Sequence, residues 1–68
     1  MSDRPELIEE LNIPAPDEFY AALMDMHRGL SDAQSRLADA KLILLLANQV
    51  GDMGVLRRAI QAAREGVA

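Results

Sequence analysis

The amino-acid sequence predicts an all-α fold, a three-helix domain in which a helical hairpin is followed by a third helix. Apolar residues recur three and four positions apart from residue 16 onward, which is the spacing of a helix face. Each break between these segments carries residues that start or stop helices, and no segment alternates like a strand. We therefore expect helices at about 16–29, 31–50 and 53–65.

The N-terminal segment is expected to be an arm that precedes the domain. A short helical turn is predicted from Asp3 to Leu11, with Asp3 as its cap. Pro14 and Pro16 are separated by one residue, so they force an extended, proline-containing connector after this turn. The predicted units are an acidic arm with its connector at 1–15 and a single helical domain at 16–68.

The first two main helices are expected to form a hairpin. Gly29 is placed to stop the first helix in the left-handed conformation. Ser31 and Gln34 then make a capping-box pattern, which starts the central helix only two residues later. A connection this short implies two helices that run antiparallel or cross steeply.

The central helix is apolar on two sides. One face is predicted to carry Leu37, Ala40, Ile43, Leu44, Ala47 and Val50, and the other Ala38, Leu42, Leu45 and Leu46. Such a helix must be covered by two neighbours of the same chain or by a second chain. The uninterrupted apolar run from Leu42 to Ala47 would span only about 9 Å, against about 30 Å of membrane hydrocarbon, so no membrane span is expected.

We predict self-association, with a dimer favoured, although two neighbours within one chain would explain both apolar faces equally well. A small chain of 68 residues without cysteine has little core and no disulfide to stabilise it, so association would help. The candidate self-association face is Leu42, Leu45 and Leu46, with Tyr20 and Met24 from the first helix.

The last helix is expected to begin after Gly51, which stops the central helix, with Asp52 as its cap. Its apolar stripe is Leu56, Ala59, Ile60, Ala63 and Val67. Its polar side carries Arg57, Arg58, Gln61 and Arg64, which we identify as a candidate partner-binding face.

The charges are unevenly distributed along the chain. The net charge is -4, but the first 32 residues carry -6 and the last 36 carry +2. The acidic N-terminal half is therefore expected to face the basic last helix, in the same chain or in a partner, although two solvated faces of opposite sign explain the pattern as well. The opening residues do not resemble a secretion signal, so the predicted location is the cytoplasm.

No group of residues predicts catalysis, a metal site or a cofactor, and the protein is not expected to be an enzyme. His27 is the single histidine, and there is no cysteine. The neighbouring acids Glu9 and Glu10 would point about 100° apart on a helix and would not converge on one substrate.

Two kinds of function then remain. The first is an accessory protein that docks on a larger enzyme through its acidic arm and its arginines. The second is a small DNA-binding regulator whose last helix enters the major groove with the four residues of the partner-binding face. The acidic net charge disfavours nucleic acid, and the accessory function is preferred.

Several stretches of the sequence resemble a bacterial family, domain of unknown function DUF2783. They are Pro16-Asp17-Glu18-Phe19-Tyr20, Gly29-Leu30-Ser31, Ser35, and the run from Ala40 to Asp52. The resemblance covers Pro16 to about Arg64. It implies a small bacterial helical protein with an enzyme partner, because some members are encoded beside flavin-dependent oxygenases of aromatic breakdown. Gln49 departs from the family, since many members have histidine there, which weakens any argument for a metal.

Overall fold

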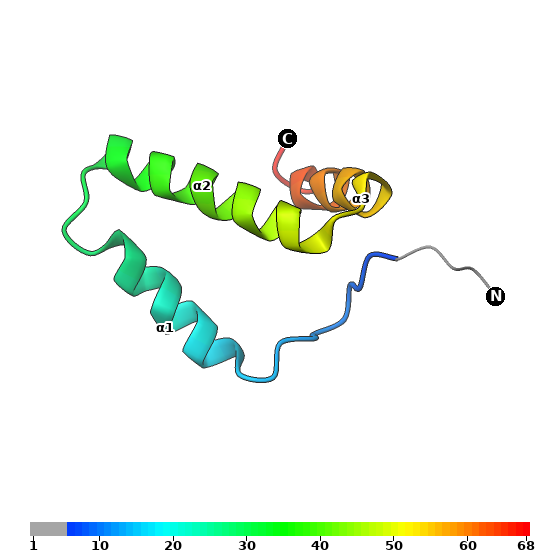
Figure 1. The fold of residues 1–68 in the computed structure, drawn as a ribbon, viewed down its shortest axis with the longest axis horizontal. Helices are drawn as coiled ribbons and strands as arrows, with labels where there is room; N and C mark the ends of the chain where they lie inside the picture. The colour runs from blue at the N-terminus through cyan, green and yellow to red at the C-terminus, as the bar shows by residue number, and fades with distance from the viewer. Residues whose placement is uncertain (1–5) are drawn as a thin grey trace.

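The computed structural model describes residues 6–68, and this part of the chain contains three helices and no strand. The helices are α1 (Pro16–His27), α2 (Asp32–Val50) and α3 (Met53–Arg64) (Figure 1). The predicted all-α class is therefore confirmed, and the predicted helix boundaries differ from the observed ones by two residues at most.

The helix ends form through the local signals that the sequence carries. At the start of α2, Ser31 Oγ accepts a hydrogen bond from the Gln34 N–H at 3.2 Å, and Gln34 Oε1 accepts one from the Ser31 N–H at 2.9 Å. At its end Gly51 has a φ of 68°, which a residue with a Cβ rarely adopts. Asp52 Oδ1 accepts from the Val55 N–H at 2.9 Å and so caps α3.

Helix α2 is the central element of the fold. α1 and α3 both pack against α2, at its two ends, and not against each other. α1 and α2 meet at the turn around Gly29 and diverge away from it, so the hairpin is open at its far end (Figure 1). The connection is as tight as predicted, but the two helices lie close together only near it.

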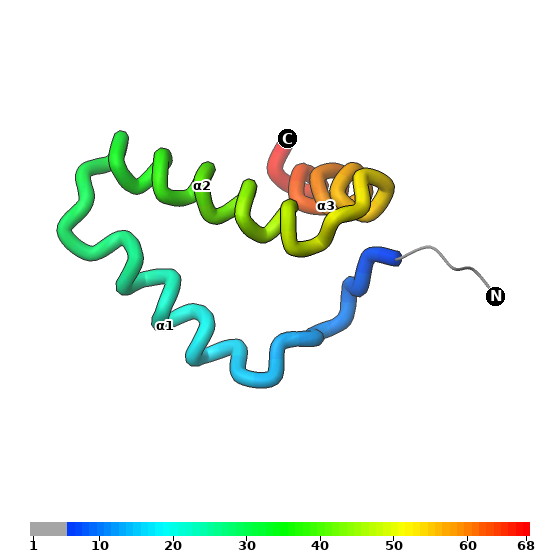
Figure 2. The backbone as a smooth tube through the Cα atoms, viewed as in Figure 1, coloured from blue at the N-terminus to red at the C-terminus, as the bar shows by residue number. Residues whose placement is uncertain are grey.

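The arm is not helical where the structure describes it. Residues 6–15 form an irregular segment that runs back from the start of α1 toward α3 (Figure 2). The predicted helical turn is therefore wrong over residues 6–11, and its first part lies outside the described residues. Nine residues are too few for an isolated helix, because the cost of the first turn is recovered only over about 12 to 15 residues or by tertiary packing.

The chain has very little core. Among residues 6–68 only Val55 is buried, with 7% of its surface exposed. The chain exposes 6272 Å², whereas a compact protein of 7.4 kDa exposes about 4,200 Å². Its radius of gyration is 14.1 Å, against about 11 Å for a compact domain of this length. α2 thus has two neighbours in its own chain, and they do not cover it.

Candidate interaction surfaces

The side of α2 that faces α1 is identified by one polar contact. His27, the last residue of α1, lies against Asp39 of α2, with 2.6 Å between His27 Nε2 and Asp39 Oδ1. Ala38 and Leu42 lie on the same side of α2 as Asp39, and all three are half-buried. Leu23, on α1, is half-buried as well. These residues form the inner side of the hairpin.

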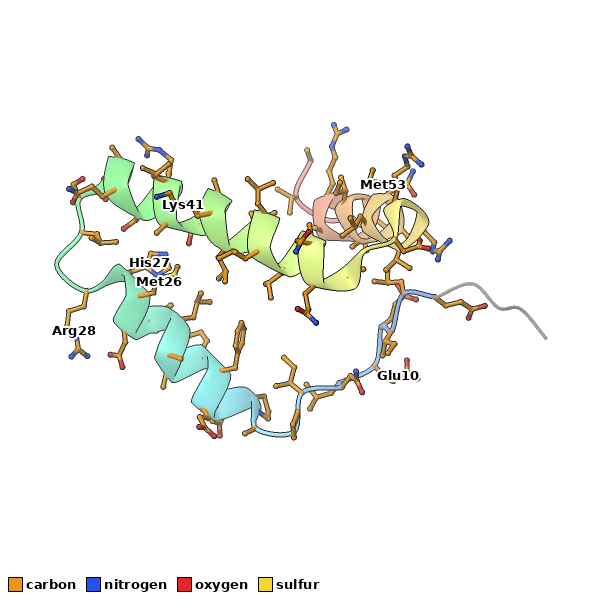
Figure 3. The ribbon with its side chains drawn as sticks, viewed as in Figure 1. Glu10, Met26, His27, Arg28, Lys41 and Met53 are labelled. Carbon is orange, nitrogen blue, oxygen red and sulfur yellow. The ribbon has the colours of Figure 1, made fainter. Side chains whose placement is uncertain are left out.

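The geometry around His27 selects its protonated form. Nδ1 lies 2.8 Å from the carbonyl oxygen of Leu23, and Nε2 lies 2.6 Å from Oδ1 of Asp39. Both oxygens only accept hydrogen bonds, so both ring nitrogens must donate, and only an imidazolium can do that. The pKa of His27 is raised, first by the Leu23 carbonyl and then by the Asp39 carboxylate. His27 points into the hairpin and Arg28 away from it (Figure 3).

This contact was not predicted from the sequence. The sequence indicates only a histidine at the end of a helix, where a positive charge is favoured. The partner lies twelve positions further on, and its approach depends on the angle between α1 and α2. The pair joins the end of α1 to α2, and residues 6–68 contain no cluster of acidic or histidine side chains able to hold a metal ion.

The structure divides the candidate self-association face. Leu42 is half-buried on the inner side of the hairpin. Leu45 and Tyr20 are 69% and 62% exposed, and Leu46 and Met24 are also exposed. Four of these five residues are therefore accessible to a partner, and they come from the two helices that diverge in Figure 1.

The opposite side of α2, which we call its outer side, is just as accessible. Leu37 is 58% exposed and Leu44 70%, and Ala33 and Ala40 are exposed with them. The sequence places Leu37 and Leu44 on an apolar face that needs cover. Of the residues on that face, only Ala47 is half-buried. The uncovered apolar surface therefore extends over both sides of α2.

The arm lies beside the arginine-bearing side of α3. Glu6, Leu7 and Glu9 line a hollow of about 300 Å³, and α3 contributes the opposite wall, formed by Arg58, Gln61, Ala62 and Glu65. Two acids of the arm are thus placed next to half of the candidate partner-binding face. Arg64 lines a second hollow with Gln61, Glu65 and Ala68, and Arg57 is exposed.

The described residues contain no helix that could span a membrane. None of the described helices is both long enough and apolar enough to cross a bilayer.

Comparison with known proteins identifies a family without assigning a reaction. No curated protein and no solved structure matches the chain. One family model, described as a protein of unknown function (DUF2783), matches residues 7–65, which is nearly the whole sequence. The chain therefore belongs to the DUF2783 family.

Proposed function

We propose that this protein is a non-catalytic interaction protein, which associates with itself and docks on a larger protein. One observation carries the proposal: the longest helix, α2, leaves apolar side chains exposed on two sides although it already has two neighbours. Exposing this much apolar surface to water is unfavourable, because burying apolar surface stabilises a protein or a complex by about 25 cal/mol per Å². A protein partner is the simplest cover for it.

Self-association is tested on the wild-type chain. Sedimentation equilibrium over a range of concentrations is expected to give a mass above 7.4 kDa that rises with concentration. Circular dichroism at the same concentrations should show helix content rising with mass, because α2 is stabilised when it is covered. A mass that stays at 7.4 kDa at every concentration would contradict self-association.

The larger partner is proposed to bind α3 and the diverging ends of the hairpin. Arg57 and Arg64 offer positive charge on α3, and Leu45, Leu46 and Tyr20 offer an apolar surface. Charge around an apolar centre is the usual arrangement of a protein interface. The class of enzyme that the family resemblance suggests is a flavin-dependent oxygenase, and the cytoplasm is the compartment in which we propose this contact.

Affinity capture from the source cell tests this second contact. Wild-type protein should retain a specific partner that a variant with Arg57→Glu and Arg64→Glu loses. Arg28→Glu is the matched control, because Arg28 is exposed at the hairpin turn, away from α3, and its variant should retain the partner. Recovery of the same proteins by all three chains would contradict the docking role of the α3 arginines.

DNA binding is the alternative, and it predicts a different result. The four residues of the partner-binding face would then contact phosphates and bases, and affinity for duplex DNA would fall steeply with salt. Glu6 and Glu9 disfavour this alternative, since they lie beside Arg58 and Gln61 and would repel phosphate there. A salt-dependent complex of wild-type protein with duplex DNA would replace the accessory function with a regulatory one.

A further inference from the structure

The outer side of α2 carries a regular pattern of small and large apolar residues. Alanines and leucines alternate at spacings of four, three, four and three, which keeps them on one face of the helix. We call this row the outer seam, and its members are Ala33, Leu37, Ala40, Leu44 and Ala47. It lies opposite Asp39 and Leu42, the residues that face α1, and only Ala47 is partly covered.

The outer seam has the same order of small and large residues from either end, with its leucines three positions before Ala40 and four positions after it. Outward from Ala40, one leucine and then one alanine follow in each direction. A two-fold symmetric interface needs this self-complementarity, because each residue of one copy must meet the mirrored position of the other. A small residue at the centre also lets two helices approach to the lower end of the usual range of about 8 to 10 Å.

The residues beside the seam favour an antiparallel pair. Gln34, Lys41 and Asn48 lie along one flank, and Arg36, Ile43 and Val50 along the other. In an antiparallel pair that crosses at Ala40, each flank meets the same flank of the other copy. Ile43 then lies beside Arg36 of the other copy, and Gln34 lies beside Asn48. Lys41 is then the single like-charged contact, and its long side chain can extend into water. In a parallel pair Arg36 would lie beside Lys41 twice.

The surplus of exposed area, summed over the whole chain, is larger than one such interface needs. The chain exposes 6272 Å², about 2,000 Å² more than a compact protein of its mass. A stable interface of standard size covers about 800 Å² on each partner. Resting on the self-association in the proposed function, we propose that a second copy of this chain docks on the outer seam, with two antiparallel α2 helices crossing at Ala40. The face predicted from the sequence, around Leu45, is then left for the larger partner.

Disulfide cross-linking tests the crossing point directly, because the chain contains no cysteine of its own. In the antiparallel pair the Ala40→Cys variant places its two thiols near the symmetry axis, within the Cα separation of about 4.4 to 6.8 Å that a disulfide needs. It should form covalent dimers on mild oxidation, whereas Ala33→Cys should not. Cross-linking by both variants would indicate a parallel pair and overturn the proposed orientation.

Ala21→Cys is the matched control, since Ala21 is an exposed alanine on α1, away from the seam. The yield of covalent dimer from this variant reports cross-linking by random collision, and the variant should remain largely monomeric under oxidation. Equal yields of dimer from Ala40→Cys and Ala21→Cys would overturn the proposed contact, because dimer formation would then not depend on the position of the cysteine.

Two charge substitutions test whether the dimer forms through the outer seam or through another surface. Leu44→Glu is expected to raise the dimer dissociation constant at least about 100-fold, because two leucines per dimer lose their burial. Leu45→Glu, the next residue and equally exposed, is expected to leave it nearly unchanged. The reverse result would place self-association on the face predicted from the sequence and overturn the outer seam. A wild type that stays monomeric would overturn both the seam and the self-association.

Discussion

Helices α2 and α3 differ in how their apolar residues are arranged and in how much of each helix the chain itself buries. α3 has one apolar stripe and a polar side, and it contains Val55, the one buried residue between positions 6 and 68. α2 is longer and apolar on most sides, yet none of its residues is buried. One neighbour can cover much of a single stripe, and here it buries Val55 and half-buries Leu56 and Ala59, although Ile60 is 67% exposed. A helix that is apolar nearly all round needs several neighbours.

The difference assigns different roles to the two helices. α3 is stabilised by contacts within its own chain, so its stability should depend little on protein concentration. α2 depends on a surface that the chain itself does not supply, so its stability should rise when a partner is present. Substitutions in the two helices should therefore differ in how their effects depend on concentration.

Val55→Ala is expected to have the largest effect on the stability of the monomer. Removing two methyl groups from a buried valine should lower the free energy of unfolding by about 2 kcal/mol. Urea denaturation at low protein concentration measures it. Ile60→Ala is the control on the same helix, because Ile60 is exposed, and it should change stability by less than about 0.5 kcal/mol. If Ile60→Ala lowered the free energy of unfolding as much as Val55→Ala does, the side of α3 that carries Ile60 would also be covered.

The start of α3 depends on one side chain, so Asp52→Ala should have the second largest effect. The Val55 N–H would lose its acceptor, and the loss of an N-cap costs about 1 kcal/mol. Asp52→Asn keeps an oxygen at the same place and should retain most of the stability. Thermal unfolding followed by circular dichroism compares the three chains. A loss of the same size in both variants would point to the charge of Asp52 rather than to its cap.

The sequence was sufficient wherever structure depends on neighbouring residues. The capping box at Ser31, the left-handed stop at Gly51 and the cap at Asp52 were each predicted and are each present, since each involves residues at most four positions apart. The same kind of signal failed in the arm. A cap and an apolar face at residues 3–11 indicate a helix, but packing on the rest of the chain was needed to stabilise it.

The interaction surfaces were predicted only in part, because they depend on the angles between helices. The sequence indicates that α2 is apolar on two sides but cannot say which side α1 covers. In the structure α1 lies against the face that carries Leu42, whereas Leu44, on the other apolar face, is exposed to solvent. The contact between His27 and Asp39, which identifies the inner side, links positions that no local rule connects.

That contact should make the stability of the hairpin depend on pH. The pKa of His27 is raised in the folded chain above its unfolded value of about 6.5. The stabilisation is therefore fully present below about pH 6.5, and it is lost as the pH rises through the folded pKa. Because His27 is the single histidine, its ring resonances in a proton NMR titration report the folded pKa without ambiguity.

Substitution of the carboxylate partner tests the origin of that pH dependence. Asp39→Asn should lower the pKa of His27 and weaken the dependence of urea stability on pH. Asp25→Asn is the matched control, because Asp25 lies on the same helix as His27 but pairs with Arg28 instead. A pKa that is the same in wild type and Asp39→Asn would show that the two side chains are not in contact in solution.

The ion pair between Arg28 and Asp25 should have the smallest effect, although its 2.7 Å separation is nearly as short as that of His27 and Asp39. Its side chains are 82% and 64% exposed, so water screens the attraction between them. They are also only three residues apart, so the pair does not connect one helix to another. Arg28→Ala should change the free energy of unfolding by less than about 0.5 kcal/mol, without dependence on pH between 6 and 9. His27→Ala, one residue earlier, should remove the pH dependence of stability. If Arg28→Ala removed it instead, the charge that fastens the hairpin would be on Arg28 rather than on the imidazolium.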